Sequence, residues 1–221
     1  MYRSLFPVLL HASTAVAGPA VSPEAEYTLQ ARVLLQDDND ARATLLAVSQ
    51  DAVPEGTLDW DDVIDDLPAW LTREGIQPPS RAVMQEVSEA LRIRLPRVTC
   101  TARDVVPLGS PEIAQYTLAC MVPDVEPAFA AYRAMRSGDD ADRDALSDAF
   151  FATFAACLRG DTAVAHLSTA VGWSSFRHGD VHAARAEHLY RTVLLGLLPF
   201  AEWDRRIASG AGRDGHEGPG E

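Results

Sequence analysis

Residues 180–209, DVHAARAEHLYRTVLLGLLPFAEWDRRIAS, are the stretch of this sequence that decides the fold. Its apolar residues recur every three or four positions, so they fall on one side of a long helix and need a second layer to cover them. Asp180 can cap the first turn. Pro199 removes a backbone donor, so we expect a kink there and a separate final turn or two over 202–207. The apolar side consists of Ala186, Leu189, Val193, Leu197 and Phe200.

The composition is that of a folding chain with an acidic surface. The 221 residues are 47% hydrophobic and 23% charged, which suits one substantial core. With 32 acidic and 19 basic residues the net charge is −13, which disfavours nucleic acid and anionic membranes as partners. Every basic residue is arginine, a bias typical of high-GC coding in a bacterium or its phage.

The N-terminus and the cysteines bear on the compartment. Residues 1–22 suit either an amphipathic helix or a weak signal-like sequence with a small-x-small site at 15–17. No stretch has the roughly 20 uninterrupted apolar residues of a membrane span. Three cysteines without a close pair argue against a disulfide framework and favour the cytoplasm, with export as the alternative if residues 1–17 are a signal peptide. They are Cys100, Cys120 and Cys157.

Three regions alternate like half-buried strands, namely 26–36, 97–106 and 113–122. A turn at 109–111 joins the second to the third, so we expect Cys100 and Cys120 on one buried face, where we interpret them as small core residues. The pattern of segment 43–49 is compatible with a strand or a helix, and its alanines favour the helix.

The remaining pattern is helical. We expect a helix over 59–74 that Pro68 splits in two, and another that begins at Ser80. After Pro123 we expect only helices, over 125–137, 141–159, 161–171 and the C-terminal stretch. The predicted fold is α+β, a small largely antiparallel sheet packed by helices, with a predominantly helical C-terminal half. The predicted organisation is one domain over 23–209, with a strand-containing half at 23–122, a helical half at 123–209 and a disordered tail at 210–221.

A short repeat is also visible. The tripeptide Tyr-Thr-Leu occurs at 27–29 and at 116–118, and each copy precedes an acidic, alanine-rich segment. Either a duplication of βα units or a chance match within an alternating pattern would explain the repeat.

One candidate site lies where the C-terminal helix begins. His178, Asp180 and His182 bring imidazole and carboxylate ligands together, which suits zinc, iron or manganese. Glu187 or Glu202 would then serve as a base. The alternative is that the histidines are polar residues flanking a turn. A pocket around Trp173, Phe176 and Tyr190 is a further possibility for a small ligand.

The charged runs give the other candidates. Aspartates interleaved with large apolar groups over 59–67 can dock a basic, hydrophobic partner, although the solvated face of an amphipathic helix has the same pattern. The residues that we assign to partner binding are Trp60, Asp61, Asp62, Asp65 and Asp66. A smaller cluster of Arg92, Arg94 and Arg97 either holds an anion or neutralises those aspartates within the fold.

The sequence contains no Gly-x-Ser-x-Gly, no His-Glu-x-x-His and no glycine-rich phosphate loop. Our first hypothesis is therefore a non-catalytic soluble interaction or accessory protein that acts through the acidic-aromatic helix face, binds a protein partner and needs no cofactor. The alternatives are a metal-dependent enzyme at His178, Asp180 and His182, or a small-ligand-binding protein with a pocket near Trp173. The oligomeric state is open.

Overall fold

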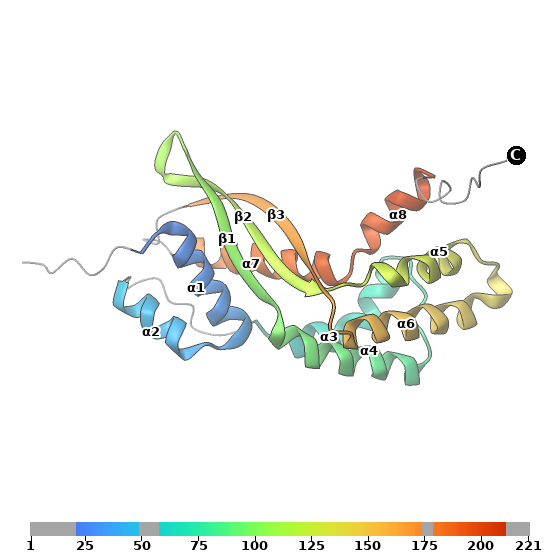
Figure 1. The fold of residues 1–221 in the computed structure, drawn as a ribbon. Coiled ribbons are helices and arrows are strands. Elements are labelled where there is room, and N and C mark those ends of the chain that lie inside the picture. Colours follow the sequence, from blue (N-terminus) through green and yellow to red (C-terminus); the bar gives the residue numbers. More distant parts are fainter. Residues whose placement is uncertain (1–20, 49–57, 174–178, 211–221) are drawn as a thin grey trace, which may run out of the picture.

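We describe the protein from a computed structural model, which places residues 21–48, 58–173 and 179–210 (Figure 1). It has the predicted α+β fold, with a three-stranded antiparallel sheet packed by helices. The helices in the described residues are α1 (Pro23–Gln36), α2 (Asn39–Val48), α3 (Trp60–Arg73), α4 (Arg81–Arg94), α5 (Phe129–Ser137), α6 (Arg143–Arg159), α7 (Gly179–Leu197) and α8 (Phe200–Ala208). The strands are β1 (Thr99–Leu108), β2 (Ser110–Pro123) and β3 (Ala163–Trp173).

The sheet has the order β1-β2-β3, with β2 in the centre. β1 and β2 form a hairpin that turns at Gly109, whose φ of 66° is the left-handed conformation that glycine tolerates best. The β2–β3 pairing is continuous over the whole of β3, from Ala163 opposite Pro123 to Trp173 opposite Ile113. The chain between these two strands forms α5 and α6, so β3 returns to the sheet after a long excursion (Figure 1).

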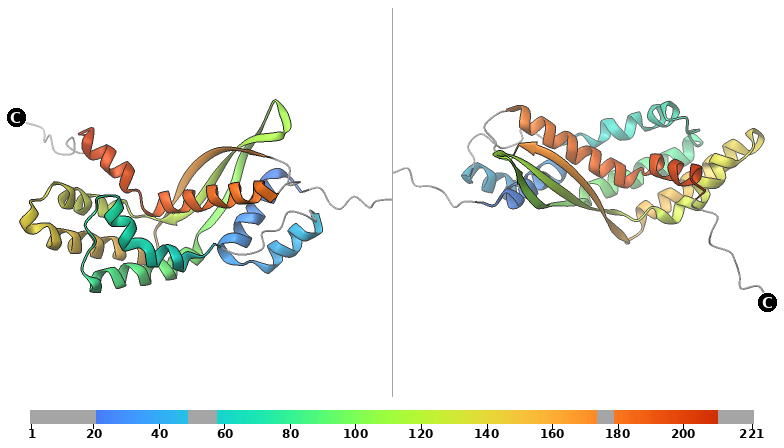
Figure 2. Two further views of the ribbon diagram at one scale, coloured as in Figure 1. Left: turned by 180° about the vertical axis from the view of Figure 1, so that it is seen from behind. Right: turned by 90° about the horizontal axis from the view of Figure 1, so that it is seen from above.

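The long C-terminal helix α7 covers one face of the sheet, as the apolar spacing predicted (Figure 2). Leu189, Val193 and Leu197 are buried against it. Gly196 allows a close approach, because a Cβ atom there would lie 3.0 Å from the Cβ and Cγ atoms of His166. The predicted break at Pro199 is confirmed, since α7 ends at Leu197 and α8 begins at Phe200.

Helices α5, α6 and α8 enclose an aromatic cluster. The ring of Tyr132 stacks on that of Phe200 at 5.4 Å between centroids and lies 5.2 Å from that of Phe150. Trp203, 1% exposed, packs on the same rings. Because aromatic side chains bury large apolar areas, this cluster fixes α8 on the helical half of the molecule.

The predicted strand over 26–36 is wrong, because these residues form helix α1. Ser22 caps α1 through its side chain, Pro23 occupies the first turn, and Asp37 ends the helix in a left-handed conformation. The helix is buried on two sides: Val33 packs on α2, whereas Tyr27 and other residues pack into the main core. Because apolar residues occur on two sides of α1, their spacing does not show a clear helical period. It resembles instead the apolar–polar alternation of a strand.

The predicted helix over 161–171 is also wrong, because Ala163–Trp173 is strand β3. Its alanines favoured a helix, but β2 needs hydrogen-bond partners on the side away from β1. With residues 26–36 in a helix, β3 supplies those partners. Tertiary pairing therefore overrides a weak local preference.

Two smaller predictions change with the fold. Helix α3 continues through Pro68 instead of splitting there. The tripeptide at 27–29 is helical, whereas its copy at 116–118 is a strand, so duplicated βα units do not explain the repeat. The segment 43–49 is helical through Val48, as its alanines suggested. The predicted N-terminal segment at 1–20 and the tail at 211–221 lie outside the described residues.

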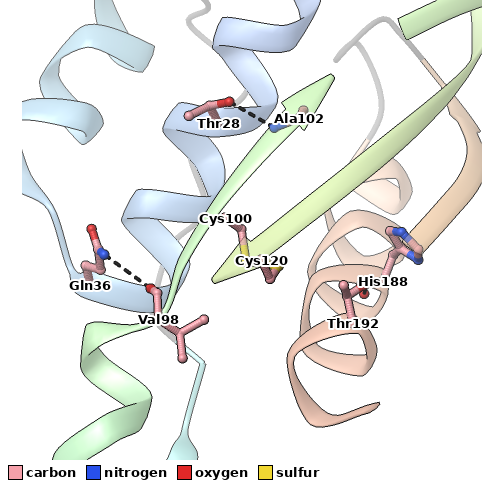
Figure 3. Close-up of a disulfide and its surroundings, with 8 residues drawn as sticks. All are labelled: Thr28, Gln36, Val98, Cys100, Ala102, Cys120, His188 and Thr192. Atoms are coloured by element: carbon pink, nitrogen blue, oxygen red, sulfur yellow. Dashed lines mark hydrogen bonds between the residues drawn. A yellow bond between two sulfur atoms is a disulfide. The ribbon is translucent and has the colours of Figure 1, made fainter. Parts of the chain in front are cut away.

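The interpretation of Cys100 and Cys120 as separate core residues is wrong as well, because they form a disulfide (Figure 3). The two residues are directly opposite each other on β1 and β2, and both are buried. The expected hairpin and the shared buried face are confirmed, and the hairpin brings the two cysteines, 20 residues apart in the sequence, close enough to bond. Cys157 is free. None of the helices in the described residues is both long and apolar enough to span a membrane.

Candidate functional site

The acidic-aromatic segment forms helix α3, and its aspartates divide into two groups. Asp59 is the N-cap, whose carboxylate accepts from the backbone N–H of Asp61 at 3.1 Å. Asp61 and Asp65 face α4, where both form ion pairs with Arg92, at 2.9 and 2.8 Å. Asp61 and Asp65 are thus neutralised within the fold, one of the alternatives that the sequence left open.

The second group borders a groove between α3 and α7. Asp66 lines the groove and pairs with Arg73 at 2.7 Å. Asp62 lies one turn before Asp66 on the same side of the helix, is exposed, and forms no ion pair with any described residue. Of the four predicted aspartates only Asp66 lines the groove, and the other charged residues of the lining are Arg73 and Arg191.

The groove has a volume of about 310 Å³ and a mostly apolar lining. Leu195 of α7 belongs to this lining and is 49% exposed. At one end Trp60 stacks on Tyr190, with ring centroids 5.6 Å apart. The other apolar and aromatic residues that line the groove are Val63, Leu67, Trp70, Leu194 and Leu198.

The three arginines of the predicted anion site lie in different surroundings. Arg92 is engaged by Asp61 and Asp65. Arg94 turns to the other side and donates to the carbonyl of Gly160 at 2.7 Å. Arg97 lies in the turn after α4. Because Arg92 and Arg94 already have partners in different directions, the three side chains are not brought together.

The predicted metal ligands lie at the edge of what the structure describes. His178 lies outside the described residues, and for Asp180 and His182 the structure places only the helical backbone of α7. Among the residues whose side chains are described, no group of three or more His, Cys, Asp or Glu is arranged to hold a metal ion. The metal hypothesis therefore stays a prediction.

The ligand pocket predicted near Trp173 falls in the same region. Phe176 lies outside the described residues, and the side chain of Trp173 is not described. Tyr190 faces α3, where it stacks on Trp60, and so belongs to the groove between α3 and α7. The structure thus assigns one member of the predicted pocket to a different surface.

Sequence reasoning missed a buried polar cluster between α1, β2 and α7. Arg185, 5% exposed, lies over the ring of Tyr27 with its Cζ atom 3.9 Å from the ring centroid. It also donates to Oε1 of Gln30 at 3.4 Å. The ring of Tyr116 is tilted by 38° against that of Tyr27, with centroids 4.4 Å apart, and forms a T-shaped contact with His188 at 5.5 Å. Arg185 is thus a charged side chain that lies inside the fold beside two aromatic residues.

The electrostatics of this cluster follow from burial. Burial raises the pKa of Glu26 to about 7, and the nearby positive charge of Arg185 offsets part of that increase. Burial likewise lowers the pKa of His188. Within the described residues, Oε1 of Glu26 and Nε2 of Gln30 are buried without a hydrogen-bond partner. Some buried polar atoms of the cluster therefore lack a hydrogen-bond partner among the described residues. The stability of the cluster depends on the protonation of its titratable groups.

One signal in the sequence could have found the cluster. Glu26 and Gln30 are four residues apart, so a helical reading of 26–36 would have placed them on one side of a helix. Arg185 could have been noticed because its position lies close to the apolar stripe of the C-terminal helix.

Comparisons of the chain with protein-family models, curated proteins and solved structures give no match.

Proposed function

We propose that this chain is a non-catalytic interaction protein and that the groove between α3 and α7 binds its protein partner. The exposed apolar lining carries the proposal, because Leu195 and its neighbours leave apolar area in water that a partner would cover. Trp70 and Tyr190 lie in the same lining and are the residue types that contribute most to protein interfaces.

The partner that fits this groove is an amphipathic helix with a basic flank. A groove between two helices accepts an apolar stripe spaced at three and four residues. Asp62, one helical turn before Asp66 and outside the lining itself, offers an exposed carboxylate, and the net charge of −13 attracts a basic partner over a longer range. Arg73 already neutralises Asp66, so we expect Asp62 to contribute more to charge recognition.

Two designed helical peptides with one apolar pattern test this proposal. One carries leucine on its apolar side and lysine elsewhere, and the other replaces every lysine with glutamate. We expect the lysine peptide to bind the purified chain at least about ten times more tightly than the glutamate peptide, measured by calorimetry at low salt. Equal affinities, or no binding of the lysine peptide, would contradict the proposal.

Matched variants locate the binding surface. Leu195→Asp places a charge in the groove and should abolish binding, whereas Leu46→Asp on α2, at a position of similar exposure, should not. Asp62→Asn should weaken binding several-fold, and Asp61→Asn, which removes a carboxylate already paired with Arg92, should leave it nearly unchanged. Loss of binding in Leu46→Asp or in Asp61→Asn alone would place the site elsewhere.

We also propose that the protein works in an oxidising compartment. The disulfide between Cys100 and Cys120 supports the exported alternative over the cytoplasmic one, because such bonds persist mainly outside the reducing cytosol. Residues 1–17 would then act as the signal peptide.

Alkylation of the protein in its producing cells tests this second part. We expect one cysteine, Cys157, to react with iodoacetamide before reduction and all three to react after it, and the intact mass to correspond to a chain that begins at Gly18. Three alkylated cysteines without reduction, on a chain that begins at Met1, would contradict export.

A further inference from the structure

The two edges of the sheet differ in how their backbone groups are satisfied. At the β1 edge, Oγ1 of Thr28 accepts from the backbone N–H of Ala102 at 3.1 Å, and Nε2 of Gln36 donates to the carbonyl of Val98 at 3.2 Å (Figure 3). Both side chains belong to α1. They bind backbone groups that another strand would otherwise pair with, so α1 closes this edge.

The register shows which groups of β3 face outward. The Cα atoms of Cys100 and Cys120 are 4.0 Å apart, the short spacing of a non-hydrogen-bonded antiparallel pair. The backbone groups of Cys120 therefore point to β3, where His166 is opposite. The backbone groups of successive residues point to opposite sides of a strand. Those of Leu167 and Thr169 therefore point away from β2, to the free edge.

This edge is open along the strand. No hydrogen bond to another described residue uses the outward backbone groups of Leu167, Thr169 or Val171. β3 has 11 residues, AVAHLSTAVGW, without proline and without an acidic or basic residue apart from one histidine. Proteins usually protect an exposed edge with short length, charge or proline, and β3 has none of these.

The sheet face beside this edge, formed by β2 and β3, is exposed and uncharged. Met121 is 42% exposed, Leu167 53% and Val171 63%. Between them lie Ala119 and Thr169 in neighbouring positions of the same face. Across β2 and β3 the edge and the face thus form one surface without charge in a chain whose net charge is −13, and Arg103 of β1, opposite Thr117, is a charged residue on the same face.

A second copy of the chain fits this surface. Two copies with a net charge of −13 repel each other unless they meet through uncharged surface. A two-fold axis places two identical edge strands antiparallel, so each can supply the donors and acceptors that the other lacks. A basic partner would bind with more favourable electrostatics to the acidic helices than to this face.

We infer that the chain forms a homodimer in which β3 pairs antiparallel with β3 of a second copy, joining the two three-stranded sheets into one. The inference concerns a different surface from the groove between α3 and α7 and does not depend on it.

Sedimentation velocity of the full chain tests the dimer. We expect a species of twice the 23.9 kDa chain mass at tens of micromolar protein. Leu167→Asp and Val171→Asp, made singly, place like charges in the interface and should weaken dimerisation at least tenfold. Because both side chains are exposed, neither variant should change the circular dichroism spectrum.

The control is Leu46→Asp, which adds the same charge at an equally exposed position on α2 and should remain a dimer. A wild-type chain that is monomeric at these concentrations would overturn the inference. So would a dimer that both β3 variants retain while folded, or one that Leu46→Asp weakens equally.

Discussion

The carboxyl group of Glu26 is partly buried, and its pKa differs strongly from the value in water. It lies in the cluster between α1 and α7, where burial raises its pKa from 4.5 to about 7 despite the charge of Arg185. In the unfolded chain the group loses its proton near pH 4.5, whereas in the folded chain it keeps the proton until about pH 7. The unfolded state thus binds fewer protons in this interval, so the folding stability contributed by Glu26 falls as pH rises through it.

We predict that the free energy of unfolding decreases by about 1–2 kcal/mol between pH 4.5 and pH 7 through this group, which is partly screened by solvent, and is level above pH 7. Glu26→Gln should remove most of this slope and stabilise the protein at pH 8, measured by urea denaturation at a series of pH values. Glu24→Gln in the same helical turn is the control and should keep the slope. An identical slope in wild type and Glu26→Gln would show that another group is responsible.

At the scale of elements, the contact between α7 and the sheet depends on the absence of a side chain at Gly196. Alanine there would gain about 1 kcal/mol of helix propensity, but its Cβ atom would lie 3.0 Å from His166 and 3.1 Å from Val122. The contacting atoms belong to a buried interface and cannot move away freely. Overpacking in such places costs about 1–3 kcal/mol, so the steric term exceeds the propensity gain.

We therefore expect Gly196→Ala to lower the free energy of unfolding by about 1 kcal/mol, measured as a lower urea midpoint with an unchanged slope. A higher midpoint would mean that α7 lies further from the sheet than the structure places it.

The elements also show what a single sequence can predict. Helix α7 has one buried side, so its period is clear. Helix α1 is buried on two sides and β3 is rich in alanine, so their local patterns were misleading. β3 becomes a strand because it pairs with β2, some 40 to 60 residues away in the sequence. No local pattern contains that information.

The candidate site, like the fold, could be predicted from the sequence only in part. The sequence identified Trp60 and the aspartates of α3, because aromatic and acidic residues alternate within one segment. The other wall of the groove, with Tyr190 and Leu195, follows only from the packing of α7 against α3. Neutralisation of Asp61 and Asp65 was foreseen as one alternative, and only the fold selects it.

At the scale of the whole molecule, α7 separates two surfaces of different chemistry. Gly196 faces the sheet, whereas Leu194, Leu195 and Leu198 line the groove with α3. On the side of the sheet away from α7, the exposed face of β2 and β3 is uncharged, whereas the groove is mostly apolar with Asp66, Arg73 and Arg191 in its lining. A dimer formed through β3 would therefore leave the groove of each copy accessible, and the two interactions should be independent of each other.

Hydrogen–deuterium exchange of the purified chain, with and without the lysine–leucine peptide, tests the central claim that the groove between α3 and α7 binds a partner. The account predicts slower exchange confined to residues 63–73 and 190–198, and no change in the Leu195→Asp variant. Protection in another part of the chain, or protection that persists in Leu195→Asp, would contradict it.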